Sequence, residues 1–247
     1  MFGGEALLDS QQQSEVEEIK AFYDSVYYAD ARPAASPALL RHYDRLHHKM
    51  SLGTSPAVLD VACGLGEWLK VCEDKGASVA GIDLSEKAID ICRQVMPQGE
   101  FYAQAAETLP FADGSFDLIT CLGSLEHFVD PVGSMREMVR VARPGAKVLL
   151  LVPNKDFLSR KLGLFRGTYQ VDAKEVVRTL PEWHELFRAA GLRVTDRWKD
   201  LHVLDPDWIA RGSPITWPIR AAQAAVLPIL PLRWQYQVYH QCAIAET

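Results

Sequence analysis

The sequence predicts an α/β protein whose mostly parallel sheet is covered by helices on both faces. Apolar stretches suited to strands, among them residues 58–61, 116–121 and 147–152, alternate with stretches of helical periodicity. Continuously apolar strands are typical of a parallel sheet that is buried on both sides. A loop with two glycines, Gly64 and Gly66, follows the first strand, where such sheets bind ligands. With 247 residues, the chain can form this core as one domain with additions.

The composition limits the kinds of partner and ligand that the protein is expected to bind. The net charge is −6 and no Lys/Arg tract occurs, which disfavours binding to a phosphate backbone. The five cysteines are odd in number and lack paired zinc spacing, so reduced core thiols are expected rather than a metal site. The N-terminus lacks the pattern of a signal peptide, and no apolar stretch reaches the length of a membrane span. We expect a cytoplasmic protein that does not bind nucleic acid.

The N-terminal region is predicted to be helical. Apolar residues at three- and four-residue steps begin a helix at Gln11, and a second helix is expected over 38–50. A proline-containing break at 31–37 separates them. We therefore expect residues 1–50 to form a helical cover and residues 51–247 to form the core.

The first strand and its loop carry the strongest chemical signal. Gly64 and Gly66 lack a Cβ atom, so the backbone can turn sharply against a ligand, and the N–H groups of the helix expected over 67–75 point at the same place. A dinucleotide fingerprint would have a third glycine where Leu69 stands, which argues against a nicotinamide-dependent oxidoreductase. Asp60 places a negative charge before the loop, which suits a cationic or amino-bearing ligand better than a phosphate.

This stretch, Asp60-Val61-Ala62-Cys63-Gly64-Leu65-Gly66, resembles the first motif of the class I S-adenosylmethionine-dependent methyltransferases, acid-apolar-small-x-Gly-x-Gly. Ala62 stands where the family usually has its first glycine. The resemblance implies a Rossmann-like sheet of seven strands, mostly parallel with an antiparallel edge strand. It also implies S-adenosylmethionine as cofactor and S-adenosylhomocysteine as product. It covers about residues 57–152 well and the rest in outline.

A second acid follows the second strand, expected over 78–83. Asp83 lies seventeen residues past Gly66, close to the spacing at which an acid bonds ribose hydroxyls. Asp83-Leu84-Ser85 also resembles the methyltransferase motif whose acid takes both ribose hydroxyls of the cofactor. The alternative role is a helix cap, but Ser85 can cap the next helix itself.

The third and fourth strands are expected over 101–103 and 116–121. Residues 105–119 resemble the family stretch acid-Ala-Glu-x-Leu-Pro-Phe, turn, Ser-Phe-Asp, in which the acid and nearby backbone meet adenine. Ala105 replaces that acid, so backbone groups and Glu107 are expected to meet the adenine. The residues that the resemblance places against the cofactor follow the strands of the sheet: Asp60, Ala62, Gly64, Gly66, Asp83, Leu84, Ala106, Glu107 and Leu122.

The loop after the fourth strand is expected to meet the methyl acceptor. His127 is the candidate general base or acceptor contact there, and its alternative role is structural. Glu126-His127 resembles the Glu-His pair of ubiquinone-pathway O-methyltransferases, in which a further glutamate three residues earlier helps to bind a divalent metal. Gly123 occupies that place, so no metal is expected. In the resembled family the N-terminal helices help to close the acceptor pocket, so Tyr23 and Tyr27 are candidate substrate contacts, with simple packing as the alternative.

The C-terminal part is predicted to complete the sheet. A helix begins at Asp130-Pro131, a further helix is expected over 182–190, and strands over 192–198 and 236–245. Two insertions are expected, at about 154–180 and 201–234. The second is rich in Pro, Trp and Arg. It has three open interpretations: an acceptor lid, a peripheral contact with a membrane surface, or a packed insertion or subunit contact, as in a homodimer.

The expected activity is methyl transfer to a small molecule, with a hydroxyl of an apolar or amphipathic metabolite as the leading acceptor. A sugar or nucleotide-sugar hydroxyl and an amine are the alternatives. A protein of another class, a non-catalytic partner or sensor that binds the cofactor, also fits the motif, because a fold does not establish turnover.

Overall fold

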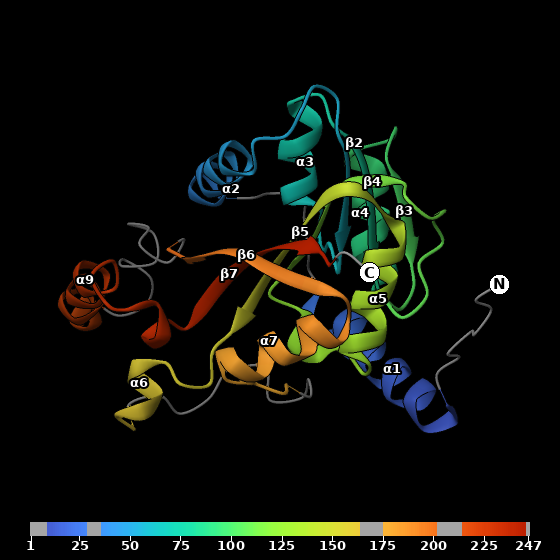
Figure 1. Cartoon of the computed structure of the whole chain (residues 1–247). Helices are drawn as coiled ribbons and strands as arrows, with labels where there is room; N and C mark the ends of the chain where they lie inside the picture. Colours follow the sequence, from blue (N-terminus) through green and yellow to red (C-terminus); the bar gives the residue numbers. More distant parts are fainter. Residues whose placement is uncertain (1–8, 29–35, 164–174, 202–213, 246–247) are drawn as a thin grey trace.

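The computed structural model describes residues 9–28, 36–163, 175–201 and 214–245 and has a seven-stranded sheet at its centre (Figure 1). The strands lie in the order β3-β2-β1-β4-β5-β7-β6. All neighbours from β3 to β5 pair in parallel, whereas β7 runs antiparallel to both β5 and β6. This confirms the predicted sheet, and the reversed strand is β7. The strands are β1 (Ala57–Val61), β2 (Ser78–Asp83), β3 (Glu100–Ala103), β4 (Phe116–Leu122), β5 (Ala142–Pro153), β6 (Leu192–Lys199) and β7 (Gln237–Ile244).

Helices connect the strands and cover the sheet. The described α-helices are α1 (Ser10–Phe22), α2 (Pro37–Met50), α3 (Glu67–Asp74), α4 (Glu86–Val95), α5 (Pro131–Val141), α6 (Leu158–Lys161), α7 (Leu180–Ala189) and α9 (Trp217–Val226). Shorter elements are the π-helix η1 (Tyr23–Tyr27) and the 3₁₀ turns η2 (Leu125–His127), η4 (Pro214–Thr216) and η5 (Leu232–Trp234). Within the described ranges, no helix has the length and apolar character needed to cross a bilayer. The predicted insertion residues 164–174 and 202–213 lie outside the described part.

The two faces of the sheet bury different helices, because successive side chains of a strand point to opposite sides. Leu59 and Val61 of β1 belong to one buried cluster, which includes Met135 of α5 and Phe187 of α7. Val58 belongs to the other cluster, together with residues of α2, α3 and α4. The double cover explains why the central strands are apolar on both sides.

Local capping places the helices that flank the site. The Ser85 hydroxyl oxygen accepts a hydrogen bond from the backbone N–H of Ala88 at 3.2 Å, so Ser85 caps α4 as expected. Asp130 caps α5 in the same way, accepting from the N–H of Gly133 at 2.9 Å. The first helix begins one residue before the expected start, because the Asp9 carboxylate accepts hydrogen bonds from its first turn.

Two segments differ from the expected pattern. Residues 143–145, an Arg-Pro-Gly sequence typical of a turn, lie inside β5, which starts at Ala142. The pairing with β4 shifts between Phe116 and Leu118, so the strand contains a bulge there. The predicted first helix ends at Phe22 and continues as the π-helix η1. A π-helix widens the turn, which changes the side that the following tyrosines face.

The core contains a histidine with one ring nitrogen that makes no hydrogen bond within the described residues. His240 of β7 is fully buried, and its Nδ1 lies 3.1 Å from the carbonyl oxygen of Val238. Its Nε2 has no hydrogen-bond partner in the described part of the chain, and its ring centroid lies 5.1 Å from that of His184. Burial, assisted by the neighbouring His184, lowers the pKa of His240 to about 3.

This predicts acid sensitivity. In the unfolded chain His240 binds a proton below about pH 6.5, whereas the folded protein binds it only near pH 3, so the free energy of unfolding falls as pH drops through this window. We expect His240→Phe to flatten the pH dependence of the free energy of unfolding between pH 6.5 and 4, with a difference of a few kcal/mol at the acid end. Urea denaturation at a series of pH values measures this dependence. His48→Phe on the exposed face of α2 is the control, and equal slopes for wild type and His240→Phe would contradict the assignment.

Candidate active site

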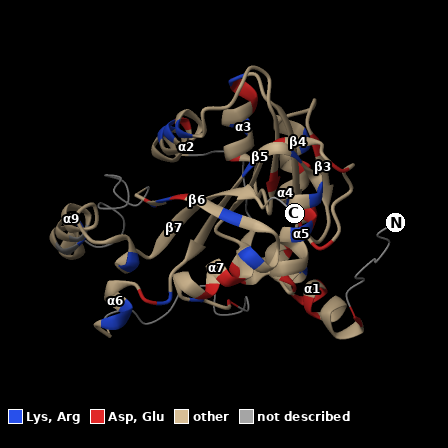
Figure 2. Cartoon of the chain, viewed as in Figure 1, with Lys and Arg blue, Asp and Glu red and all other residues tan. Residues whose placement is uncertain are grey.

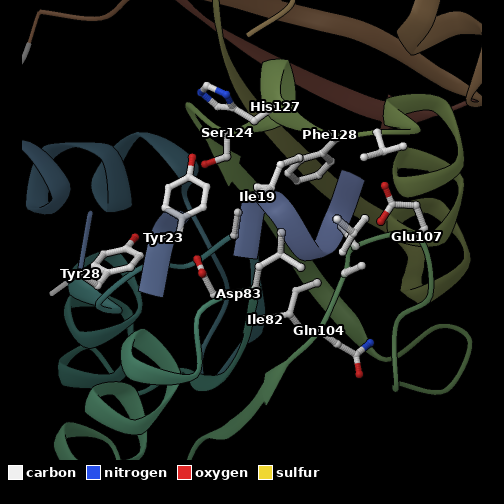
Figure 3. A pocket seen from close by; sticks show the side chains of 16 residues that line it. Ile19, Tyr23, Tyr28, Ile82, Asp83, Gln104, Glu107, Ser124, His127 and Phe128 are labelled. Carbon is white, nitrogen blue, oxygen red and sulfur yellow. The ribbon is translucent and has the colours of Figure 1, made fainter. Parts of the chain in front are cut away.

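The predicted site residues meet at the carboxyl edge of the parallel strands. Two adjoining cavities lie there between α1 and η1 on one side and the loops after β1, β2, β3 and β4 on the other. Figure 3 shows the first of them. Tyr23, Tyr28, Ala62, Ser124 and His127 line both cavities, so the two are continuous. Parallel sheets bind ligands at this edge.

The glycine loop has the backbone shape that its residues indicate. Ala62, Gly64 and Gly66 have φ angles of 62°, 53° and 76°, in the left-handed region. Ala62 therefore carries strain of about 1 kcal/mol that a glycine would avoid, which explains the glycine usual there in the resembled family. Gly66 lines neither cavity. A Cβ atom on it would lie 2.6 Å from Cε of Met96 and 2.9 Å from Sγ of Cys92, so this glycine allows close packing behind the loop.

Asp83 ends β2 with its carboxylate in the wall of the first cavity, next to Leu84. The residue is 8% exposed. One oxygen accepts the N–H of Gly64 at 2.9 Å, and the other accepts the N–H of Ser85 at 2.9 Å. Burial raises the pKa of Asp83, and these backbone bonds oppose the rise. Each oxygen keeps an acceptor site, so the group can also bind a ligand's hydroxyls.

Asp60 lies deeper, in the wall of the second cavity. Its Oδ1 accepts the hydroxyl of Thr120 at 2.5 Å, and that hydroxyl oxygen accepts the indole N–H of Trp68 at 3.1 Å. Burial raises the pKa of Asp60 well above its ordinary value, against the Thr120 bond, and burial also raises the pKa of Glu67. Two acids and no Lys or Arg line this cavity within the described residues. A cationic ligand group would relieve their desolvation.

The loop after β3 forms another wall of the first cavity, with Ala106 and Glu107 facing it. Glu107 accepts the N–H of Asp130 at 3.2 Å, and burial raises the pKa of its carboxyl group. Gln104 and Phe128 also line this cavity and were missed by sequence reasoning (Figure 3). Neither belongs to a motif; the only available signal was their position just after a strand or beside a motif.

The N-terminal tyrosines face the cavities. Tyr23 and Tyr28 line both, and Tyr27 and Tyr43 line the second. The rings of Tyr23 and Tyr27 lie 5.5 Å apart and those of Tyr27 and Tyr28 lie 4.8 Å apart, in edge-to-face contacts. Burial raises the pKa of both Tyr23 and Tyr28, so their hydroxyls stay protonated and can act as hydrogen-bond donors. In Figure 3 the Tyr23 hydroxyl points toward Ser124.

A hydrogen bond holds this segment over the site. The Ser85 hydroxyl donates to the Asp24 carboxylate at 2.5 Å and so joins η1 to the start of α4. The cover and the core therefore meet at the site itself.

The loop after β4 places His127 at the junction of the cavities, whereas Leu122 lines only the second. Glu126 lines neither cavity: it is 5% exposed, and its Oε2 has no hydrogen-bond partner in the described part of the chain. Burial raises the pKa of Glu126 to about 8, with a smaller contribution from Glu175. Within the described ranges, no three His, Cys, Asp or Glu side chains are grouped as metal ligands.

Together the walls suit the two ends of one cofactor. The first cavity offers an apolar slot that includes Ile82, Leu84 and Phe128, with Asp83 beside it, which fits an adenine ring and a ribose. The second offers Asp60 and Glu67, which fit an ammonium and a sulfonium group. The glycine loop between them leaves the backbone open to close approach.

Comparisons with known proteins indicate the family of the chain. Residues 59–150 match the methyltransferase domain family. The chain is 31% identical over 169 residues to the demethylmenaquinone methyltransferase of Renibacterium salmoninarum, covering 67% of this chain and 68% of the relative. It is 36% identical over 117 residues to the ubiquinone biosynthesis O-methyltransferase of Aromatoleum aromaticum, covering 45% of this chain and only 50% of that relative.

The fold comparison gives the same answer for the architecture. A methyltransferase of Aquifex aeolicus, described as SAM-dependent, superposes with a TM-score of 0.58 at 16% identity, covering 85% of this chain and 94% of that one. The chain therefore belongs to the class I S-adenosylmethionine-dependent methyltransferases, with S-adenosylmethionine as cofactor and S-adenosylhomocysteine as product.

Proposed function

We propose that this protein methylates a hydroxyl group of an apolar or amphipathic small molecule, which is held in the second cavity beside His127. The observation that carries the proposal is the junction of the two cavities. His127 lines both of them, and the second cavity adds the aromatic walls of Tyr27, Tyr43 and Trp68 to the acids near the glycine loop. An aromatic wall next to the cofactor suits a ring-bearing or apolar acceptor.

Each group has a role in this scheme. Asp83 holds the ribose hydroxyls, while the backbone around Ala106 and the Glu107 side chain meet the adenine. Asp60 holds the amino end through its buried carboxylate. When bound, the cofactor supplies a methyl group already activated for transfer. The chain orients the acceptor through Tyr23 and Tyr27, excludes water, and moves the hydroxyl proton to a ring nitrogen of His127.

We also propose that two parts of the chain have different roles, which the architecture supports. Residues 1–50 act as the cover of the site and residues 51–247 as the core, with additions at 154–180 and 201–234. The cover contributes Ile19 and Tyr23 to the first cavity. A cytoplasmic location and a homodimer stay predictions.

The names of the relatives support a small-molecule acceptor. One is a demethylmenaquinone methyltransferase and the other a ubiquinone biosynthesis O-methyltransferase, so both are named for quinone chemistry and one for O-methylation. The sugar, amine and sensor alternatives are separated from this proposal by the experiments below.

The Asp83 carboxylate is expected to control cofactor affinity. Removing a charge-assisted pair of bonds to ribose hydroxyls should weaken S-adenosylmethionine about tenfold to a hundredfold. Isothermal titration of Asp83→Asn measures this, with Asp90→Asn on the exposed face of α4 as matched control. Because Asp83 also accepts two backbone N–H bonds, the melting temperature of the ligand-free variant is measured alongside. Unchanged affinity in a folded Asp83→Asn protein would remove the ribose role.

Transfer of label from methyl-labelled S-adenosylmethionine into a cell extract tests the acceptor class. We expect label in the organic-soluble fraction, because the second cavity has aromatic walls. Label confined to the small aqueous fraction would point to a sugar or an amine. As a control, the extract is shown to contain acceptors of related enzymes. Tight cofactor binding without label in any fraction would then favour the sensor alternative.

The role of His127 is tested by comparing the turnover of a His127 variant with that of a variant of its neighbour Glu126. Loss of a positioned general base costs about a hundredfold or more in turnover. We expect that loss for His127→Ala, assayed with the labelled organic product, and a change of only a few-fold for Glu126→Gln, whose side chain lines neither cavity. The rates are compared from pH 6 to 9. The opposite pattern, a large loss in Glu126→Gln alone, would transfer the base role to Glu126.

A further inference from the structure

The helix α9 leaves apolar side chains uncovered. None of its described side chains is buried, and Trp217 and Val226 at its ends are exposed. Beside it, Ile215 is 85% exposed and Ile229 is 79% exposed. Figure 1 shows α9 standing beyond β6 and β7, away from the helices that cover the sheet. Four large apolar side chains are thus exposed within fifteen residues, and we call these residues, Ile215, Trp217, Val226 and Ile229, the α9 face.

The segment that follows α9 is tied firmly to the body. Gln235 is buried, and its side-chain amide donates to the carbonyl oxygens of Leu227 and Leu230 at 2.8 and 3.1 Å. The buried Asn154 amide donates to the carbonyl oxygens of Arg233 and Gln235 at 2.9 and 3.1 Å. Such satisfied buried amides fix the loop geometry. These bonds anchor residues 227–235, where the segment that carries the α9 face enters β7.

The segment that carries the α9 face has charges of one sign. Residues 214–245 contain Arg220 and Arg233 and no Asp or Glu, in a chain whose net charge is −6. Arg160 and Lys161 of α6 lie exposed on the same side of the molecule (Figure 2), where Lys161 also pairs with Asp156 at 3.5 Å. Arg233 also lies over the ring of Trp234, 5.2 Å from its centroid. Apolar projections set among cations complement a surface that carries anionic headgroups over an apolar layer.

The α9 face lies at the same edge of the sheet as the site. The segment from α9 leads into β7, whose first residue, Gln237, pairs with the last residue of β5. A third cavity reaches Gln237 and Tyr239 and shares Tyr43, Leu122 and Gly123 with the second cavity. Gaps between side chains therefore lead from the proposed acceptor site toward β7 and the loop that carries α9.

We propose that the α9 face docks on the surface of an anionic lipid bilayer, with its apolar side chains in the headgroup boundary and the basic residues of α6, α9 and η5 on lipid phosphates. Ten residues of helix span about 15 Å, enough to lie in the interface and too short to cross it. A bilayer accepts isolated projecting side chains without a matching groove, which favours it over a folded protein partner. The orientation toward the acceptor rests on the proposed function, whereas lipid contact does not.

Vesicle sedimentation with the full chain tests the proposal. We expect binding to vesicles of phosphatidylcholine with 30% phosphatidylglycerol, at least tenfold weaker binding to pure phosphatidylcholine, and weakening by 0.5 M NaCl, as headgroup electrostatics require. The double variant Ile215→Ser/Ile229→Ser should bind at least tenfold more weakly, because it removes two of the projecting apolar groups. Arg160→Glu/Lys161→Glu should weaken binding to the anionic vesicles selectively.

Tyr102→Ser, another exposed apolar position, lies on β3 at the opposite edge of the sheet and is the matched control. No binding to either vesicle, or equal binding by wild type and the Ile215→Ser/Ile229→Ser variant, overturns the proposal. Sedimentation velocity without lipid supplies the other test. If the wild-type protein is a dimer and the Ile215→Ser/Ile229→Ser variant is a monomer, the α9 face is assigned to contact with a second copy instead. Titration of S-adenosylmethionine, expected to be unchanged in the variant, separates failure of this proposal from failure of the proposed function.

Discussion

The buried carboxylate of Asp83 joins the two loops on which the site depends. By accepting the N–H of Gly64 and the N–H of Ser85, it fixes the glycine loop after β1 and the start of α4 after β2 with one group. Ser85 in turn donates to Asp24 and so holds the N-terminal cover in place. The desolvation that burial imposes on a charge is offset by these backbone bonds and would be offset further by a ligand's hydroxyls. The Asp83 carboxylate thus both makes the site rigid and favours the binding of a ligand's hydroxyls.

The sequence predicts the cofactor half of the site because backbone requirements dictate its residues. Left-handed turns demand glycine at Gly64, and a parallel sheet brings the ends of β1, β2 and β3 to one edge whatever the rest of the chain does. Gly66 illustrates the limit of this logic. Its place at the cofactor stays a prediction, and the structure shows a further requirement: a Cβ atom there would meet Met96 and Cys92, a contact between distant residues that no local pattern reveals.

The proposed acceptor half of the site is set by tertiary packing, and sequence reasoning reached it only in part. The tyrosines were expected there, whereas the π-helix that turns Tyr27 toward the second cavity was not. His42 is half-buried, with its Nε2 2.8 Å from the Tyr239 hydroxyl, because β7 inserts beside β5 and meets α2. No pattern in the sequence predicts this contact. In the sequence, Glu126 is an acidic residue in the loop expected after the fourth strand. Only the three-dimensional structure shows that it is buried.

The reversal of β7 explains how one edge of the sheet can serve both chemistry and docking. If β7 were parallel to β5, its first residue would lie at the opposite edge, and the chain entering it would arrive far from the site. Because β7 runs antiparallel, Gln237 pairs with Pro153 and the loop that carries α9 is anchored where β5 ends. Insertions between β6 and β7 therefore extend the site edge without disturbing the cofactor loops. In the sheet order, two strands, β4 and β5, lie between β1 with its glycine loop and β7, into which the α9 segment leads. The surface that meets a partner can therefore vary while the cofactor site stays unchanged.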